Sequence, residues 1–152
     1  MNIEYMTKVK ENPKINNFVN RGFSEEKIQK IESKYNKGKK FPKAFREFLF
    51  LAGDFNNFGF DDIDGIIELQ ELAKEELEMA GQKVEKPFFA FDVYNSQYSV
   101  IFLDETKDDP KVYLISPFLA KGGEMPLIKP NGWEFTTLVN EHIHRVKNNI
   151  PF

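Results

Sequence analysis

The sequence contains no cysteine and only two histidines among its 152 residues. The absence of cysteine excludes a disulfide scaffold, a thiol nucleophile and a cysteine-ligated metal site. His142 and His144 lie in a stretch of helical periodicity, where a spacing of two places them on opposite faces. They therefore cannot chelate one metal ion as an i, i+4 pair can, and we expect neither a metal site nor a cofactor.

Long apolar runs and the common catalytic motifs are also missing. The first twelve residues contain no apolar run, so we expect neither a signal peptide nor a membrane span. We therefore expect a cytoplasmic location and no membrane partner. No glycine-rich phosphate loop and no GxSxG nucleophile motif occurs. Asp92 and Asp104 could form a carboxylate pair on neighbouring strands. Such pairs are common at strand ends, however, so we expect a protein that is not an enzyme.

Phenylalanine, in contrast, is abundant, with 16 copies. Hydrophobic residues make up 41% and charged residues 30% of the chain, an ordinary composition for a soluble protein. A chain of this length can bury a full core, and we expect one domain spanning residues 1–152. The many phenylalanines predict a core built on aromatic packing.

One stretch, FPKAFREFLFLAG at residues 41–53, is expected to form the central core helix. Pro42 suits the first turn of a helix, and Gly53 suits a left-handed C′ position that ends it. Apolar residues recur on one helical face and also lie off that face, which is typical of a helix buried on nearly all sides.

The remaining patterns predict an α+β fold. Strands with short connections imply an antiparallel meander, and we expect helices to pack on one side of that sheet, with N-terminal helices and a C-terminal helix. We expect helices at residues 2–11, 25–35, 69–80 and 133–148, strands at 88–94, 98–104 and 112–116, and short strands at 66–67 and 125–129.

Charge is distributed unevenly along the chain. Residues 1–46 carry 12 Lys and Arg against 5 Asp and Glu, and residues 54–80 carry 9 Asp and Glu against Lys74 alone. Such runs are usually two solvated faces that attract each other, but one face could instead meet a charged partner. The basic loop 36–40 is more typical of a solvated loop than of a nucleic-acid contact, so no direct nucleic-acid binding is expected.

The acidic stretch offers the most interesting candidate binding site. Its loop contains three phenylalanines, of which at least two are expected to fold back onto the core. An exposed one beside the acidic residues would make an apolar anchor with a charged rim. The aspartates lack the full calcium-loop pattern, so we read them as solvated. The candidate partner-binding residues are Phe55, Phe58, Phe60, Asp61, Asp62, Asp64, Glu68, Glu71 and Glu75.

Taken in order, these patterns resemble the SUKH superfamily over roughly residues 24 to 146. The match begins with an apolar residue, a proline and an aromatic-rich helix that ends in glycine. It continues through the predicted strands and into the start of the last helix. The residues that carry it are Phe41-Pro42, Phe45, Phe48-Leu49, Gly53, Phe89-Ala90-Phe91-Asp92, Tyr98–Leu103, Val112-Tyr113-Leu114 and Trp133-Glu134-Phe135.

The resemblance implies a binding protein rather than an enzyme. Bacterial members of the superfamily are inferred to be immunity proteins that neutralise toxins, often nucleases or deaminases, by direct binding. A basic cognate toxin would fit the acidic stretch. The alternative is a scaffold or regulator like the yeast cell-wall-assembly and glucan-synthesis regulator of the same superfamily. Neither implication specifies an oligomeric state.

Overall fold

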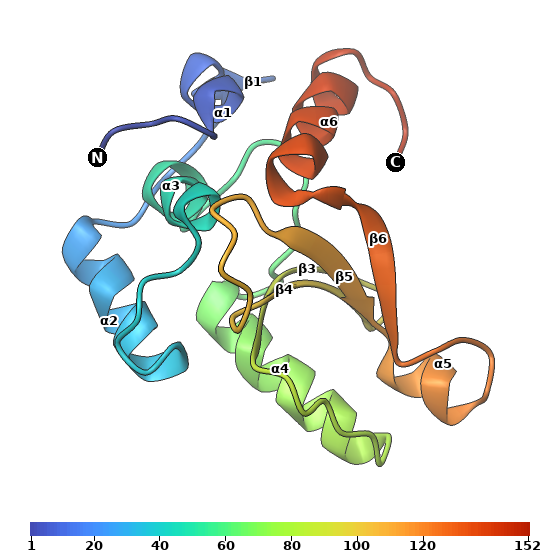
Figure 1. Ribbon diagram of the computed structural model, residues 1–152. Helices are drawn as coiled ribbons and strands as arrows, with labels where there is room; N and C mark the ends of the chain where they lie inside the picture. Colours follow the sequence, from blue (N-terminus) through green and yellow to red (C-terminus); the bar gives the residue numbers. More distant parts are fainter. The chain divides into compact units, whose positions relative to one another are not determined.

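The protein is described by a computed structural model that covers residues 1–152 (Figure 1). The fold is α+β, as the sequence predicts. No helix combines the length and the apolar character that crossing a membrane would require. The elements in order are α1 (Thr7–Glu11), β1 (Lys14–Ile15), β2 (Phe18–Val19), α2 (Glu25–Tyr35), α3 (Lys43–Ala52), α4 (Ile66–Met79), β3 (Phe88–Tyr94), β4 (Gln97–Phe102), β5 (Lys111–Ile115), α5 (Pro117–Lys121), β6 (Ile128–Glu134) and α6 (Phe135–Lys147).

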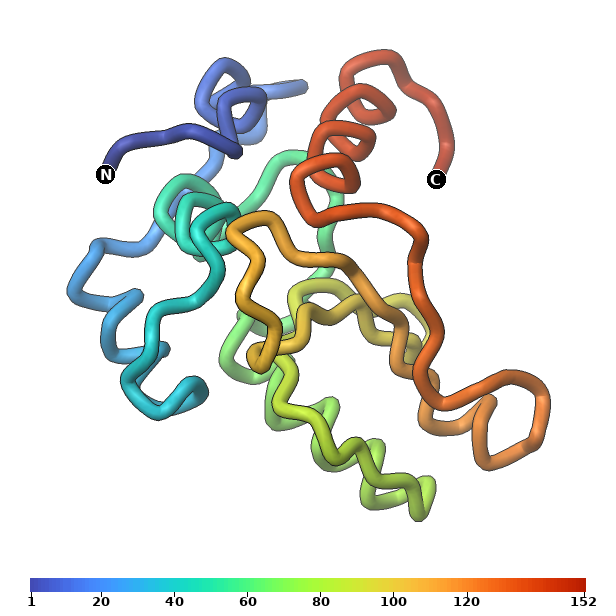
Figure 2. Tube along the Cα trace, in the orientation of Figure 1, coloured from blue at the N-terminus to red at the C-terminus, as the bar shows by residue number.

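The chain forms two compact units, each assembled from separate stretches of sequence. The first unit comprises residues 1–59, 106–110 and 134–152, and the second comprises residues 60–105 and 111–133. The first unit contains helices α1, α2, α3 and α6. The second contains helices α4 and α5 and strands β3 to β6 up to residue 133 (Figure 2). The single domain expected from the chain length stays a prediction.

Helix α3 is the centre of the first unit, which confirms the core helix expected from the sequence. It contacts α1, α2 and α6. The rings of Phe45 and Phe48 are both buried, with centroids 5.5 Å apart. Each also packs on Phe135 of α6, at 5.2 and 5.4 Å respectively. Three aromatic rings in mutual contact therefore join α3 to α6.

The end of α3 differs from the prediction in one respect. Gly53 has φ of −68°, in the right-handed region, so the expected left-handed C′ conformation is wrong. The glycine is required by close packing instead. A Cβ atom at this position would lie 2.6 Å from the Leu49 carbonyl oxygen and 2.6 Å from the Phe23 ring.

A buried carboxylate ties the N-terminal segment to α3. Glu47 is fully buried, and its Oε1 accepts hydrogen bonds from the backbone N–H groups of Glu4, Tyr5 and Met6 at 3.0, 2.8 and 3.0 Å. An ionised oxygen that accepts several N–H groups is a strong acceptor. Glu47 therefore fixes the segment that leads into α1 through Oε1, while its buried Oε2 has no hydrogen-bond partner.

The second unit is built on a four-stranded antiparallel meander in the order β3-β4-β5-β6, as predicted. Helix α4 packs against β3 (Figure 1). The buried Gln70 fixes this packing, because its Nε2 donates to the Ala90 carbonyl at 2.7 Å and its Oε1 accepts from the Ala90 N–H at 2.8 Å. The core beneath α4 consists of Leu69, Ala73, Leu77, Ala90, Val93, Tyr98, Val100, Phe102 and Ile115.

Two short strands were placed wrongly by the sequence patterns. Residues 66–67, expected in an edge strand, begin α4, because Ile66 extends the buried helical face that continues with Leu69 and Ala73. The strand expected at 125–129 is β6, which starts and ends later and includes Trp133, expected in the last helix. β6 is an edge strand, where Pro130 is tolerated because one side needs no hydrogen-bond donor.

Candidate functional site

The candidate residues from the sequence are divided between the two units. Phe55 and Phe58 belong to the first unit, whereas Phe60 and all the acidic candidates belong to the second. Phe58 is fully buried and packs on Phe48 with ring centroids 6.1 Å apart. Phe60 is also buried and packs on Phe91 at 4.9 Å. Two of the three phenylalanines thus fill the core, as expected, and neither presents its ring to a partner.

Phe55 is half-buried and lies in a small aromatic cluster of the first unit. Its ring is 6.2 Å from that of Phe18, whose side chain is 59% exposed, and the Arg21 guanidinium lies 5.0 Å above it. Arg21 also pairs with Asp54 at 3.2 Å and forms an antiparallel bridge with the Phe55 backbone. Phe55 therefore keeps accessible aromatic surface, and Phe18 adds to it.

The acidic loop that leads into α4 is held in place by β3. The Asp61 N–H donates to Asp92 Oδ1 at 2.7 Å, and the Val93 N–H donates to the Asp61 carbonyl at 3.0 Å. Asp61 Oδ1 in turn accepts from the Ile63 N–H at 2.8 Å. These bonds give the loop a defined shape, so that its side chains project from a fixed backbone.

Ile63, at the tip of this loop, is the functional candidate that the sequence patterns missed. Its φ of +63° lies in the left-handed region, which a β-branched residue rarely adopts, and its side chain is 54% exposed. Holding such a residue in this conformation costs on the order of 1 kcal/mol or more. The available signal was an isoleucine between Asp62 and Asp64, an apolar side chain within an acidic loop.

Helix α4 continues the acidic surface along its outer side. Glu68, Glu71 and Glu75 are spaced three and four residues apart, lie on one helical face and are exposed. Asp61 and Asp64 are exposed as well, and Asp62 is half-buried. The structure therefore brings together all the acidic candidates in one unit.

Glu76 on the same helix forms hydrogen bonds within the protein instead of facing solvent with the other glutamates. Its carboxylate accepts hydrogen bonds from Ser96 Oγ at 3.0 Å and from the Tyr98 hydroxyl. Burial, followed by the hydrogen bond to Glu76, raises the pKa of Tyr98 well above its usual value. The tyrosine remains a donor at every ordinary pH, and Glu76 is not part of the accessible acidic surface.

Asp92 is the one carboxyl group here with a strongly perturbed proton affinity. Burial raises the pKa of Asp92 to about 6, against the opposing effect of the hydrogen bond from the Asp61 N–H, while the nearby Asp61 charge adds to the rise. The folded protein therefore binds a proton at Asp92 over a pH range in which the unfolded chain does not. The stability that this proton contributes is full below about pH 4 and is lost as the pH rises through about 6.

Replacing Asp92 with asparagine is expected to stabilise the protein at pH 7 by about 1–2 kcal/mol, because the amide oxygen still accepts from Asp61 without burying a charge. Urea unfolding of both proteins between pH 4 and 7 measures this. The wild type should lose stability relative to Asp92→Asn across that range. Parallel pH curves for the two proteins would contradict the assignment.

The alternative carboxylate pair is not assembled. Asp92 pairs with Ser99 near the β3–β4 turn, whereas Asp104 follows Phe102, which pairs with Phe88 at the other end of these strands. Asp104 instead lies 3.7 Å from the Lys86 ammonium. The two carboxylates therefore cannot act together on one substrate atom, and no acid–base pair is formed.

The histidines do not meet at one site either. His144 is exposed, and His142 is half-buried with its Nδ1 at 2.9 Å from the Phe58 carbonyl oxygen. Burial lowers the pKa of His142, which favours the neutral ring at pH 7. No group of three or more His, Asp and Glu side chains is placed to hold a metal ion.

A model of a known protein family matches most of the chain. The model of the SMI1/KNR4 family (SUKH-1) matches residues 22–137, which include α2, α3, the whole meander and the start of α6. Neither the curated proteins nor the solved structures that were searched contain a match. The matched region covers most of the stretch on which the resemblance to the SUKH superfamily rests. The chain therefore belongs to the SMI1/KNR4 family, SUKH-1.

Proposed function

We propose that this protein is a non-enzymatic immunity protein that neutralises a cognate toxin by binding it directly. Membership of SUKH-1 supports a role in binding. The observation that carries the proposal is an ordered acidic surface with an exposed apolar residue at its tip. This acidic face consists of Asp61, Asp62, Asp64, Glu68, Glu71 and Glu75, with Ile63 among them.

A toxin that cleaves or modifies nucleic acid fits this face by its chemistry. Such an enzyme needs a basic cleft to hold phosphates, and its binding to nucleic acid is largely electrostatic. The acidic face can occupy that cleft in place of the nucleic acid, and the opposite charges accelerate encounter. Nuclease–immunity pairs are among the tightest protein complexes, so this mode of inhibition has sufficient strength.

Ile63 adds an apolar contact to an interface that otherwise depends on charge. Interfaces depend on a few desolvated anchors surrounded by polar groups. Ile63 stands between two aspartates on a backbone that is fixed before binding, so little conformational entropy is lost on docking. Phe58 and Phe60 are left out of the proposed contact, since their side chains are buried. Phe55 remains a separate candidate in the first unit.

If the proposal holds, a toxin gene should adjoin the gene for this protein, and the test is a titration of that toxin. Toxin activity should fall linearly with added protein and reach zero at a fixed molar ratio, because a binding inhibitor acts stoichiometrically. Neutralisation by a small fraction of one equivalent would show turnover and contradict the proposal. A gene that lies alone in the genome, together with full toxin activity at several equivalents, would favour the scaffold alternative.

A further inference from the structure

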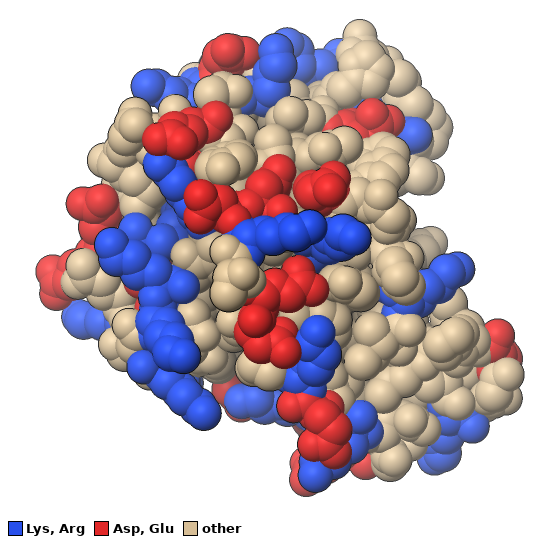
Figure 3. All heavy atoms as spheres, in the orientation of Figure 1, with Lys and Arg blue, Asp and Glu red and all other residues tan.

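The first unit carries a second charged surface, of opposite sign, that the proposed function does not use. Lys34 at the end of α2 and three lysines of the following loop are all exposed. No Asp or Glu occurs between residues 33 and 46. Figure 3 shows Lys and Arg side chains grouped over the region of α2 and this loop. We define the basic surface as Lys34, Lys37, Lys39 and Lys40.

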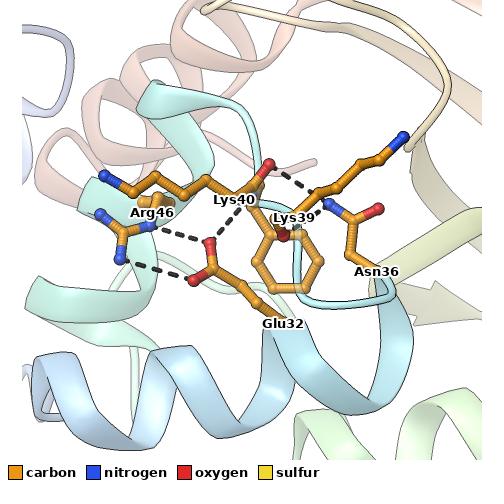
Figure 4. A network of polar contacts seen from close by, with 6 residues as sticks. Glu32, Asn36, Lys39, Lys40 and Arg46 are labelled. Atoms are coloured by element: carbon orange, nitrogen blue, oxygen red, sulfur yellow. Dashed lines mark hydrogen bonds and ion pairs between the residues drawn. The ribbon is translucent and has the colours of Figure 1, made fainter.

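The loop that carries these lysines is held by its own hydrogen bonds. Asn36 Nδ2 donates to the carbonyl oxygens of Lys39 at 2.9 Å and Lys40 at 3.2 Å (Figure 4). The N–H groups of Asn36 and Gly38 both donate to the Glu32 carbonyl, at 2.8 and 3.1 Å. One side chain and one carbonyl thus set the course of the loop, and the lysines extend from a fixed backbone.

The carboxylate of Glu32, next to this segment in the chain, is bound by Phe41 and Arg46 and not by the lysines. Glu32 is only 3% exposed, and its Oε2 accepts from the Phe41 N–H at 2.6 Å and from Arg46 Nε at 2.9 Å (Figure 4). The negative charge of Glu32 is therefore paired with Arg46 inside the protein. None of the four lysines of the basic surface forms an ion pair in the structure.

From this arrangement we infer that the basic surface binds an acidic segment of a partner protein, an extended stretch that carries several Asp or Glu side chains. The lysines suit such a segment because they are spread out. Lys39 and Lys40 extend in opposite directions from the loop (Figure 4), so a single small anion could not meet both. The fixed backbone lowers the entropy lost on binding.

A nucleic acid fits the same surface less well. Sequence-independent binding of single strands combines positive charge with aromatic rings on which bases stack. The one aromatic residue in this segment, Tyr35, is half-buried, and the Lys34 ammonium lies 5.1 Å over its ring. The basic surface contains no arginine, the residue that makes bidentate contacts with phosphates and guanine. An acidic protein segment requires only the charges.

The test uses fluorescence anisotropy with two labelled probes, a ten-residue peptide of alternating Asp and Glu and a ten-nucleotide single-stranded DNA, at low salt. The triple variant Lys37→Glu, Lys39→Glu, Lys40→Glu should bind the peptide at least about tenfold more weakly than the wild type. The matched control reverses three exposed lysines of the second unit, Lys83, Lys121 and Lys129, and changes the net charge equally. It should bind within about twofold of the wild type.

A third variant tests whether peptide binding depends on the fixed backbone of the loop or only on the number of positive charges. Asn36→Ala keeps every lysine but removes the bonds to the Lys39 and Lys40 carbonyls, and it should weaken peptide binding a few-fold while the protein stays folded by circular dichroism. Equal losses in the triple variant and its control would overturn the inference, as would unchanged binding by Asn36→Ala. Tighter binding of the DNA than of the peptide, lost in the triple variant, would overturn the assignment to a protein partner.

Discussion

Replacing Glu47 with alanine is expected to lower the free energy of unfolding by about 3 kcal/mol or more. The carboxylate is fully buried and accepts three backbone N–H groups from residues 4–6. Alanine would leave these donors without their acceptor and would open a void beside α3. An unsatisfied buried donor costs roughly 1–3 kcal/mol, and the three losses are not simply additive because the segment can partly reach water.

The matched variant is Glu47→Gln, which keeps one acceptor oxygen in a side chain of nearly the same shape, removes the charge and places an NH2 group where the buried Oε2 has no partner. It should lose less than half as much stability as Glu47→Ala in urea unfolding at pH 7. If the two variants were equally unstable, the negative charge rather than the acceptor would carry the effect. An unfolding midpoint of Glu47→Ala equal to that of the wild type would show that the N-terminal segment is not anchored through this residue.

The local parts of the fold could be predicted because their signals lie within a few residues. The spacing of Phe45 and Phe48 in a largely apolar stretch indicates a core helix, and the rings pack as expected. The strands of the meander show the same local consistency. The predicted strand ended before Pro130 and Gly132, whereas β6 runs through both, which an edge strand permits.

The parts that could not be predicted depend on contacts between residues far apart in the chain. In the sequence, Glu47 is only a charged residue within a largely apolar helix. It acts as a hydrogen-bond acceptor because the backbone of residues 4–6 packs against it in the folded protein. The shape of the acidic loop likewise depends on Asp92, 31 positions beyond Asp61. Hydrophobic patterning contains no information about such pairings, although it correctly indicated that most of the loop phenylalanines are buried.

Reversing the charge of the acidic face is expected to weaken toxin binding by at least about 100-fold. The variant carries lysine at Asp64, Glu68, Glu71 and Glu75, which are all exposed, and it leaves unchanged Asp61 and Asp92, whose hydrogen bond holds the loop to β3. Each lysine replaces an attraction to a basic cleft with a repulsion. Close charge pairs at a nuclease–inhibitor interface have coupling energies of about 1.5–7 kcal/mol, so four reversals suffice for a loss of this size.

The matched control carries lysine at Glu11, Glu26, Glu85 and Glu124, four exposed acidic residues elsewhere in the chain. It has the same net charge as the first variant, so a general effect of charge on encounter would weaken both equally. Circular dichroism and thermal unfolding of each variant establish that the fold is intact.

In addition, Ile63→Asn should bind the toxin about tenfold more weakly than the wild type yet be slightly more stable, since asparagine tolerates positive φ better than isoleucine.

The most direct measurement is the dissociation constant of the complex with the toxin expected to be encoded beside this gene, determined by titration calorimetry for the wild type, the acidic-face variant and its control. We predict a one-to-one complex whose affinity falls at least about 100-fold in the acidic-face variant and stays within a few-fold of the wild type in the control. Equal affinities for all three proteins, each shown to be folded, would contradict the claim that the acidic face is where this protein binds its target.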